Sequence, residues 1–368
     1  MKLIETHRDA LLRPLQAVTG IVERRHTLPI LSNVLIERKS GALNLTATDL
    51  EIQVMTSSEC PSDGEGIAIT VSARKLQEIL RCLPDSVDVT LEISDSRLHV
   101  KADRSRFNLQ TLPAEDYPRI AEATEVATAL VIPQRDFRHV LSLVQYAMAQ
   151  QDIRYYLNGL LVIVDAGTVT VVATDGHRLA LASLDTHQPS PRQEVILPRK
   201  AVAELIKLLA DGEEPVRFEV LSNQVRFSFG TTFLVSKLVD GKFPDYKRVI
   251  PTGYQKHFAI DRLALLHALQ RAAILSNEKF RGVRWILSSG SLRIACTNTE
   301  QEEAQEELEI DYQGDTLDMG FNVTYLTDVL ANLDAPTVDC ALGASNSSAL
   351  ITVPGNEHFL YVVMPMRI

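Results

Sequence analysis

The chain has 368 residues and a formal net charge of −10, and 45% of its residues are hydrophobic. This length suffices for two or three globular domains, while the acidic balance argues against indiscriminate nucleic-acid binding by the whole surface. Four widely separated cysteines without a C-x-x-C spacing argue against a disulfide framework or a cysteine metal site, and no stretch of about 18 uncharged apolar residues could span a membrane.

The first third of the chain predicts a mixture of helices and short strands. A helical pattern covers residues 8–22 and contains Pro14, which should kink the helix or lie in its first turn. The elements predicted after it are strands at 34–36, 43–46 and 52–54, a helix at 74–83, and strands at 87–93, 97–100 and 106–109.

The helix predicted at 74–83 occurs three times in the sequence. Its apolar residues follow the i, i+3, i+4, i+7 spacing of one helical face, and the same face returns 126 and then another 124 residues later. The three sets are Leu76, Ile79, Leu80 and Leu83; Val202, Leu205, Ile206 and Leu209; and Leu326, Val329, Leu330 and Leu333. Such a long interval indicates duplicated domains, because short solenoid repeats have periods of roughly 20–50 residues.

A second motif repeats at nearly the same interval. Ala47-Thr48-Asp49 returns as Ala173-Thr174-Asp175 and then as Cys296-Thr297-Asn298. The second unit predicts helices at 136–147 and 199–209 and strands at 160–164, 169–173, 216–220 and 225–229, and the third unit follows the same order. We therefore predict an α+β protein of three similar domains, 1–125, 126–252 and 253–368, each with about two helices packed on antiparallel sheets.

Charge is unevenly distributed over the three predicted domains. Residues 126–252 carry 14 Lys and Arg against 13 Asp and Glu, whereas residues 253–368 carry 8 against 15. The otherwise polar helix faces carry Arg8, Arg13, Arg74, Arg81, Arg135, Arg138, Lys200, Lys207, Arg262 and Arg271. A surface that contacts DNA would therefore be a local basic one, although exposed helices carry charges in any case.

Several longer strings resemble one protein family, the β subunit of bacterial DNA polymerase III, or sliding clamp. They span the chain in the family's order: Thr27–Leu31 (TLPIL), Gln151–Gly159 (QDIRYYLNG), Ala173–Leu179 (ATDGHRL), Phe243–Tyr246 (FPDY), Arg271–Lys279 (RAAILSNEK) and Tyr361–Ile368 (YVVMPMRI). The family usually ends in Leu where this chain has Ile368.

The resemblance implies a DNA-clamp fold and a homodimer in which two chains join head-to-tail into a six-domain ring. Such a ring is a processivity factor that encircles double-stranded DNA, slides without sequence readout and tethers the polymerase. It implies no catalysis and no cofactor or metal. The implied partners are the DNA polymerase III catalytic subunit, the ATP-driven clamp loader, and other polymerases and repair proteins that carry a clamp-binding peptide.

The resemblance also implies a hydrophobic groove between the second and third domains that takes this peptide. The matching positions are Leu157, Thr174, Gly176, His177, Arg178, Leu179, Pro244, Arg248, Val249, Ser348, Val362, Val363, Met364, Pro365, Met366 and Arg367. Flexible methionines suit a site that accepts different peptides. The valines also suit the core face of a final strand.

Two further sets of positions follow from the resemblance. The DNA-contact candidates are Arg25, Gln151, Tyr155, Tyr156 and Lys200. The dimer-interface candidates are Lys75, Arg104, Arg106, Phe107, Leu109, Ile274, Leu275, Glu302 and Glu303. The tyrosines could instead be half-buried core residues, and the glutamates a solvated acidic surface or a cation site.

Two alternatives remain open from the sequence. One is a specialised relative of the clamp with altered partner or inhibitor binding. The other is a metal-dependent hydrolase that uses Asp175, His177 and the Glu302–Glu303 pair, although no H-x-x-x-H spacing or ordered nucleophile supports it. The N-terminal MKLIETHRDALL lacks the apolar core of a signal peptide, so we expect a cytoplasmic protein associated with the nucleoid.

Overall fold

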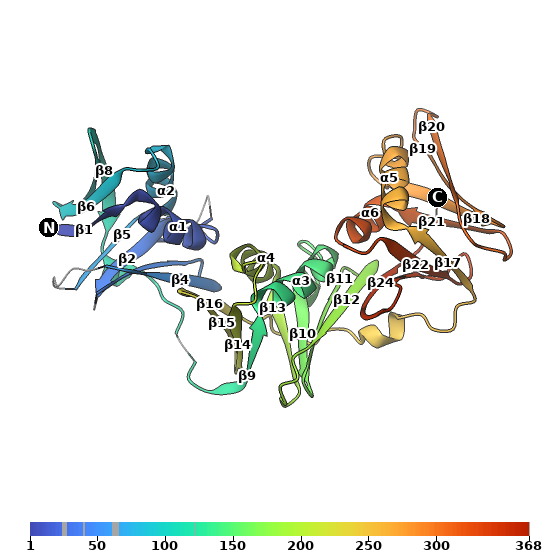
Figure 1. Ribbon diagram of the computed structural model, residues 1–368, viewed down its shortest axis with the longest axis horizontal. Helices are drawn as coiled ribbons and strands as arrows, with labels where there is room; N and C mark the ends of the chain where they lie inside the picture. Colours follow the sequence, from blue (N-terminus) through green and yellow to red (C-terminus); the bar gives the residue numbers. More distant parts are fainter. Residues whose placement is uncertain (24–27, 40, 61–65, 122, 368) are drawn as a thin grey trace. The chain divides into compact units, whose positions relative to one another are not determined.

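The computed structural model describes residues 1–23, 28–39, 41–60, 66–121 and 123–367. Within them one order of elements occurs three times: a strand, a helix, four strands, a second helix and three strands (Figure 1). The repeat inferred from the helix motif therefore extends to the complete order of elements.

The N-terminal repeat confirms the strands and helices predicted there and adds β1 and β5. Pro14 lies inside α1 and not in its first turn. The elements are β1 (Lys2–His7), α1 (Arg8–Thr19), the 3-10 helix η1 (Pro29–Ser32), β2 (Asn33–Lys39), β3 (Ala42–Thr48), β4 (Ile52–Glu59), β5 (Ile67–Ser72), α2 (Ala73–Cys82), β6 (Asp88–Ser94), β7 (Arg97–Ala102), β8 (Ser105–Leu112) and η2 (Ala114–Asp116).

The central repeat has the predicted helices, but the first is shorter than expected and ends in a 3-10 turn. Its elements are β9 (Val126–Pro133), α3 (Gln134–Val144), η3 (Gln145–Ala147), η4 (Tyr155–Asn158), β10 (Gly159–Asp165), β11 (Thr168–Thr174), β12 (Arg178–Asp185), β13 (Gln193–Pro198), α4 (Arg199–Leu208), β14 (Pro215–Leu221), β15 (Gln224–Phe229), β16 (Thr232–Lys237) and η5 (Tyr246–Val249).

The C-terminal repeat has the same order. Asp261 and Asn322 cap its two helices by accepting hydrogen bonds from Ala264 N and Thr324 N. Its elements are β17 (Lys256–Asp261), α5 (Arg262–Ala273), β18 (Gly282–Ser288), β19 (Ser291–Thr297), β20 (Glu303–Glu309), β21 (Leu317–Asn322), α6 (Val323–Ala331), β22 (Thr337–Leu342), β23 (Ala349–Val353) and β24 (Asn356–Val363).

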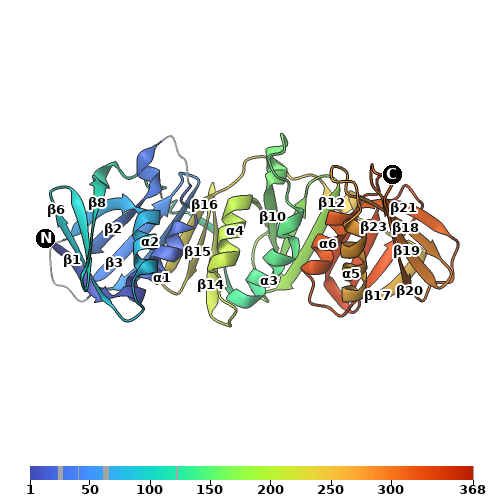
Figure 2. The same cartoon turned by 90° about the horizontal axis from the view of Figure 1, so that it is seen from above.

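The chain forms two compact units, residues 1–135 with 200–238, and residues 136–199 with 239–368. The first contains a twelve-stranded sheet in the order β1-β6-β7-β8-β5-β2-β3-β4-β16-β15-β14-β9. The second contains an eight-stranded sheet, β13-β10-β11-β12-β24-β23-β22-β17, and a four-stranded sheet, β20-β19-β18-β21. In this second unit, α5 and α6 lie side by side (Figures 1 and 2).

Each long sheet runs from one repeat into the next. In the first unit, β4 pairs antiparallel with β16, for example Gln53 with Val235. In the second unit, the corresponding strand β12 pairs with β24, for example Leu179 with Val362. Consecutive repeats are thus joined by backbone hydrogen bonds between equivalent strands.

The repeated helix face is buried, as its spacing predicts. Leu76 and Leu80 are at most 2% exposed, as are Val202, Leu326 and Leu330 in the other two repeats, while Ile206 is half-buried. Two cations expected on polar helix faces are instead anchored inside: Arg8 is 8% exposed and donates to the carbonyl of Leu83, and Arg262 donates to the carbonyls of Leu330 and Ala335. Helical spacing alone could not show that these guanidinium groups close the ends of neighbouring helices.

Among the described residues, no helix is long and apolar enough to cross a membrane.

Candidate binding pocket

A tight turn between β11 and β12 forms one wall of the candidate site. Asp175 Oδ1 accepts hydrogen bonds from the backbone N–H groups of His177 (2.9 Å) and Arg178 (3.1 Å), and Thr174 Oγ1 accepts from Gly176 N (3.1 Å). Gly176 has φ +90°, and a Cβ there would lie 3.1 Å from Nη2 of Arg154. The side chains of Thr174 and Asp175 therefore hold the backbone of the turn, and a glycine at 176 accommodates the positive φ beside Arg154.

The same turn occurs in the N-terminal repeat, which explains the repeated Ala-Thr-Asp motif. Asp49 Oδ1 accepts from Glu51 N (3.0 Å) and Ile52 N (2.8 Å), and Leu50 takes the left-handed conformation of Gly176 with φ +79°. The motif thus encodes a backbone turn, and only the central copy builds a wall of this pocket.

Arg178 fixes this wall against the C-terminal domain. Its side chain is 9% exposed and donates to Asp175 Oδ2 (3.1 Å), Asp328 Oδ2 (2.6 Å) and the carbonyl of Tyr146 (2.6 Å). The guanidinium carbon lies 4.4 Å from the ring centroid of Tyr325, which adds a cation–π contact. The polar atoms of Arg178 are engaged by these partners, so its stem can serve as lining.

The pocket beside this wall has a volume of about 170 Å³. It is formed by η4, the β11–β12 turn, the segment before and through η5, and the end of β24. The lining residues are Arg154, Leu157, Thr174, Gly176, His177, Arg178, Leu179, Pro244, Asp245, Tyr246, Val249, Val362 and Met364.

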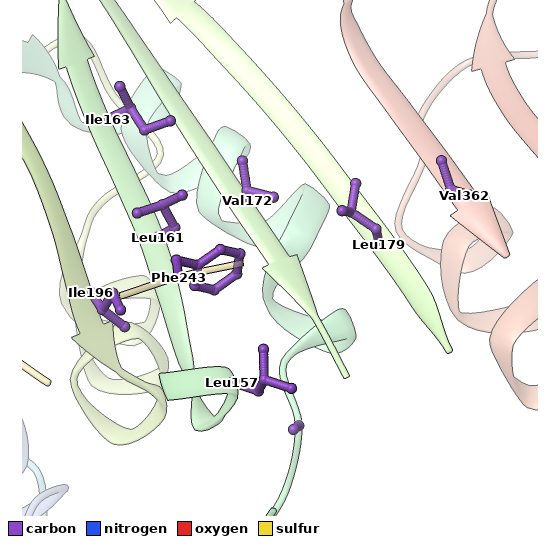
Figure 3. Close-up of a cluster of buried hydrophobic side chains, with 9 residues drawn as sticks. Leu157, Leu161, Ile163, Val172, Leu179, Ile196, Phe243 and Val362 are labelled. Carbon is purple, nitrogen blue, oxygen red and sulfur yellow. The ribbon is translucent and has the colours of Figure 1, made fainter. Parts of the chain in front are cut away.

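An apolar cluster supports the floor of the pocket. Leu157, Leu179 and Val362 line the pocket and belong to a buried cluster with Leu161, Ile163, Val172, Ile196 and Phe243 (Figure 3). These side chains come from both the central and the C-terminal domain. An apolar, preformed concavity with few polar groups at its rim is suited to bulky apolar side chains of a ligand.

Tyr246 and Asp245 supply polar groups at the opposite wall. Burial raises the pKa of the Tyr246 hydroxyl above its ordinary value, so this group remains a hydrogen-bond donor at neutral pH. Asp245 forms an ion pair with Arg248 at 2.8 Å. Arg248 itself is 84% exposed and does not line the pocket.

Ten of the sixteen positions expected in the groove line this pocket. The structure does not bring Arg248, Ser348, Val363, Pro365, Met366 or Arg367 to it. Val362 and Val363 alternate across β24, so only Val362 faces the pocket while Val363 is fully buried. Met366 does not line the pocket; its backbone N–H donates to the carbonyl of Gly320 in β21 (2.8 Å), and the two residues form a β-bridge.

Arg154, Asp245 and Tyr246 line the pocket and were not in the expected set. All three lie in strings that carried the family resemblance, immediately beside expected DNA or groove residues. Their adjacency to expected residues was a signal that could have found them.

The expected DNA-contact residues differ in exposure. Gln151 and Tyr155 are exposed and Tyr156 is half-buried on the η4 loop, where Tyr155 and Tyr156 have ring centroids 5.9 Å apart. Arg154 donates to Asp152 in this loop and lowers the pKa of that carboxyl to about 2. Arg25 lies outside the described residues.

Lys200 is less available than its sequence position suggested. Its ammonium group bonds to Asp49 and, at 3.0 Å, to Glu23. Although burial lowers the pKa of Lys200, these two carboxylates more than offset it, and the pKa is raised. Lys200 therefore carries a structural role in the first unit.

The expected dimer-interface residues lie at the surfaces of their domains. Ile274 is 77% exposed, and Leu275, Phe107 and Leu109 are half-buried. The charged candidates are all exposed: Lys75, Arg104, Arg106, Glu302 and Glu303.

The geometry does not assemble the metal-hydrolase alternative. In the described part of the chain, no three His, Cys, Asp or Glu side chains are placed to hold a metal ion. Asp175 is engaged by its own turn and by Arg178, and Glu302 accepts from Asn298 Nδ2. These carboxylates stabilise turns.

Three tandem α+β domains and an apolar pocket built from two of them define a multidomain binding protein. Models of the DNA polymerase III beta subunit match the chain in order: the N-terminal domain at residues 1–121, the central domain at 131–245 and the C-terminal domain at 247–367.

Known relatives agree with these matches over the whole chain. The beta sliding clamp of Pseudomonas putida is 48% identical over 362 residues, 98% of each chain. A crystal structure of the DNA polymerase sliding clamp of Pseudomonas aeruginosa with ligand is 47% identical, with a TM-score of 0.95 over 100% of both chains. Another, bound to griselimycin, is 48% identical with a TM-score of 0.95 over 99% of both. The chain belongs to the DNA polymerase III beta subunit family of sliding clamps.

Proposed function

We propose that two copies of this chain close head-to-tail into a six-domain ring around double-stranded DNA and act as a processivity factor. The observation that carries the proposal is a third pair of strands equivalent to the two pairs that already join the domains. We also propose that each chain divides into domains between residues 125 and 126 and between residues 252 and 253.

Two strands that join no domains within the chain are equivalent to those in the two joined pairs. β20 holds the place of β4 and β12 in its repeat, and β8 holds the place of β16 and β24. β20 is the terminal strand of its four-stranded sheet. β8 contacts β5 through Thr111 and Leu112 alone, so residues 105–110 have a strand on one side only within the described chain. Free edges favour pairing with another chain, and a contact between first and last domains is heterologous and can close a ring.

The repeat also gives the register of this contact. Transferring the pairings Gln53–Val235 and Leu179–Val362 to the third junction places Glu303 opposite Asn108 of the second copy. Arg106 then lies diagonally opposite Glu303 and Glu307, within reach of a cross-strand ion pair. Ile274 and Leu275 supply apolar surface that suits Phe107 and Leu109.

A ring of this kind needs only weak contacts with DNA. Enclosure prevents release, while cations and polar side chains facing phosphates do not read sequence and permit sliding. The exposed Gln151 and Tyr155, with Tyr156 behind them, suit such a contact. Arg25 remains a candidate.

The pocket would recruit partners through a short linear peptide with bulky apolar residues. A few apolar anchors in a preformed site give exchangeable affinity, which suits sequential use by polymerase, clamp loader and repair proteins. The ring itself would be non-catalytic, the polymerase activity belonging to its partner, and would work on the nucleoid in the cytoplasm. A specialised relative with altered partner or inhibitor binding would have the same ring.

Topological enclosure can be tested directly. The chain would be loaded by a clamp-loader complex with ATP onto nicked circular DNA, and the DNA would then be cut at one site. We expect the protein to co-elute with circular DNA and to be lost after linearisation. Equal retention on both would contradict enclosure.

A further inference from the structure

The turn between β11 and β12 is tied to the C-terminal domain at two points. One is a backbone hydrogen bond, from Met364 N to the carbonyl of His177 (2.8 Å). The other is the ion pair of Arg178 with Asp328 on α6 (2.6 Å). Asp175 also binds the guanidinium group, but it belongs to the same turn and cannot fix the turn against another element. Asp328 is therefore the carboxylate that holds Arg178 from outside the turn.

The junction in the first unit provides an internal comparison, because the turn after β3 has the same build. Lys237 N donates to the carbonyl of Glu51 (2.9 Å), which repeats the backbone tie of the second unit. The side-chain tie is different: Lys200 on α4 binds Asp49, so the cation comes from the helix and the carboxylate from the turn. Both junctions thus keep the backbone hydrogen bond, while their charges are arranged differently.

The positions of Arg178 and Asp328 carry other residues in the first unit. Ile52 stands at the place of Arg178, three positions after the aspartate of the motif, and it is fully buried. Glu204 stands at the place of Asp328 and pairs with Lys207 on its own helix (2.7 Å). A junction of this build therefore closes with an apolar residue at the place of Arg178, and the Arg–Asp pair occurs where the turn lines a pocket.

The ion pair bears on one wall of the pocket. Arg178 lines the pocket, whereas Asp328 is not among its lining residues in the described chain. Without Asp328 the guanidinium group would keep Asp175 and the carbonyl of Tyr146, which both belong to the central domain, and the stem of the side chain would shift toward them. The pocket has a volume of only about 170 Å³, so the fit of an apolar side chain depends on the position of each wall.

We infer that Asp328 is a positioning residue of the peptide site: it holds Arg178 in the pocket wall and thereby sets the affinity for a peptide that it does not touch. The inference rests on the proposed use of the pocket for partner peptides. It gives α6 of the C-terminal domain a part in recognition.

A double-mutant cycle separates this role from a general loosening of the junction. Fluorescence anisotropy would give the dissociation constant of a fluorescein-labelled short peptide with bulky apolar residues for the parent chain, Asp328→Ala, Arg178→Met and the double variant. Arg178→Met keeps an apolar stem and removes the charge. We expect Asp328→Ala to weaken binding by about fivefold in the parent chain, and by less than about twofold in the Arg178→Met chain.

The outcomes distinguish the positioning role from the peptide site itself. Undiminished binding by Asp328→Ala, or an equal loss in both backgrounds, would overturn the positioning role and leave the peptide site standing. A parent chain that does not bind the peptide would overturn the peptide site and the inference with it.

Two further variants control for folding, which thermal unfolding would monitor. Thr327→Ala changes the neighbouring residue on α6, whose hydroxyl donates to the carbonyl of Thr324 (3.1 Å), and it should bind the peptide like the parent chain. An equal weakening by Thr327→Ala would assign the effect to the helix and overturn the inference. Asp328→Asn keeps the shape and one acceptor oxygen, so it should lose less affinity than Asp328→Ala, and it takes the place of Asp328→Ala in the cycle if that variant does not fold.

Discussion

Nη1 of Arg178 lies 2.6 Å from Oδ2 of Asp328, a residue 150 positions further along the chain. This ion pair joins the central domain to the C-terminal domain beside the shared β12–β24 ladder. Because Arg178 also lines the pocket, one side chain connects the domain junction with the candidate partner site.

Breaking this pair should destabilise the second unit. Asp328→Ala removes one carboxylate from a guanidinium that is 9% exposed, and we expect a loss of about 1–3 kcal/mol in the free energy of unfolding. Urea denaturation followed by circular dichroism would measure it. The matched control is Asp245→Ala, whose partner Arg248 is 84% exposed, with an expected effect below about 0.5 kcal/mol. Equal losses of unfolding free energy in the two variants would contradict the claim that burial makes the Arg178–Asp328 pair the more stabilising one.

Shortening a pocket side chain should weaken peptide binding without affecting assembly. Met364 is 41% exposed and lines the pocket, so Met364→Ala should reduce affinity by about tenfold for a fluorescent short linear peptide with bulky apolar residues. Fluorescence anisotropy would measure the dissociation constant. Met366→Ala is the control because Met366 lies outside the pocket. If Met366→Ala weakened binding as much, the peptide site would have to extend beyond the pocket to Met366.

Removing the apolar surface of the last domain should prevent dimer formation. Ile274→Ala with Leu275→Ala should give monomers at concentrations where the parent chain is dimeric, because apolar anchors supply much of the energy of an interface. Light scattering after size-exclusion chromatography would measure the mass. Leu263→Ala, at a residue 47% exposed on α5, should leave the dimer intact. A double variant that is still dimeric on dilution would remove both residues from the interface.

The η4 loop should keep its ion pair across the physiological pH range. The hydrogen bond from Arg154 lowers the pKa of Asp152 to about 2, below an unfolded value of about 4. A lowered folded pKa means that the stabilisation is fully present above about pH 4 and is lost as pH falls through about 2. Carboxyl NMR titration would measure the midpoint. In Arg154→Ala it should move up toward about 4; an unchanged midpoint would contradict this cause.

The sequence predicted the repeat, both helices of each domain and most strands of the first two domains. Apolar spacing along a helix or strand, and its return at a fixed interval, can be recognised in the sequence without knowledge of tertiary contacts. The prediction missed β1, β5, β9, β12, β13 and β16. β12 pairs with both β11 and β24, and its buried residues Leu179, Ala180 and Ala182 do not alternate along the strand, so no period-2 pattern marks it in the sequence.

The pocket was predicted in outline by resemblance, but its edges needed the structure. Val362 and Val363 are both valines, and the register of β24 alone decides which one faces the pocket. Lys200 likewise lies on the polar face of a helix, where the sequence predicts an exposed cation. In the structure, Asp49, 151 residues earlier in the chain, binds its ammonium group. Such long-range partners cannot be derived from the composition of one helix.

A closed ring is tested most simply by the solution mass of the chain, measured by sedimentation velocity over a concentration series. We expect a single species of twice the 40.9 kDa chain mass that persists on dilution, because two strand-pairing interfaces must open together for the ring to dissociate. A monomer at every concentration would leave the fold and the pocket intact and would contradict the ring.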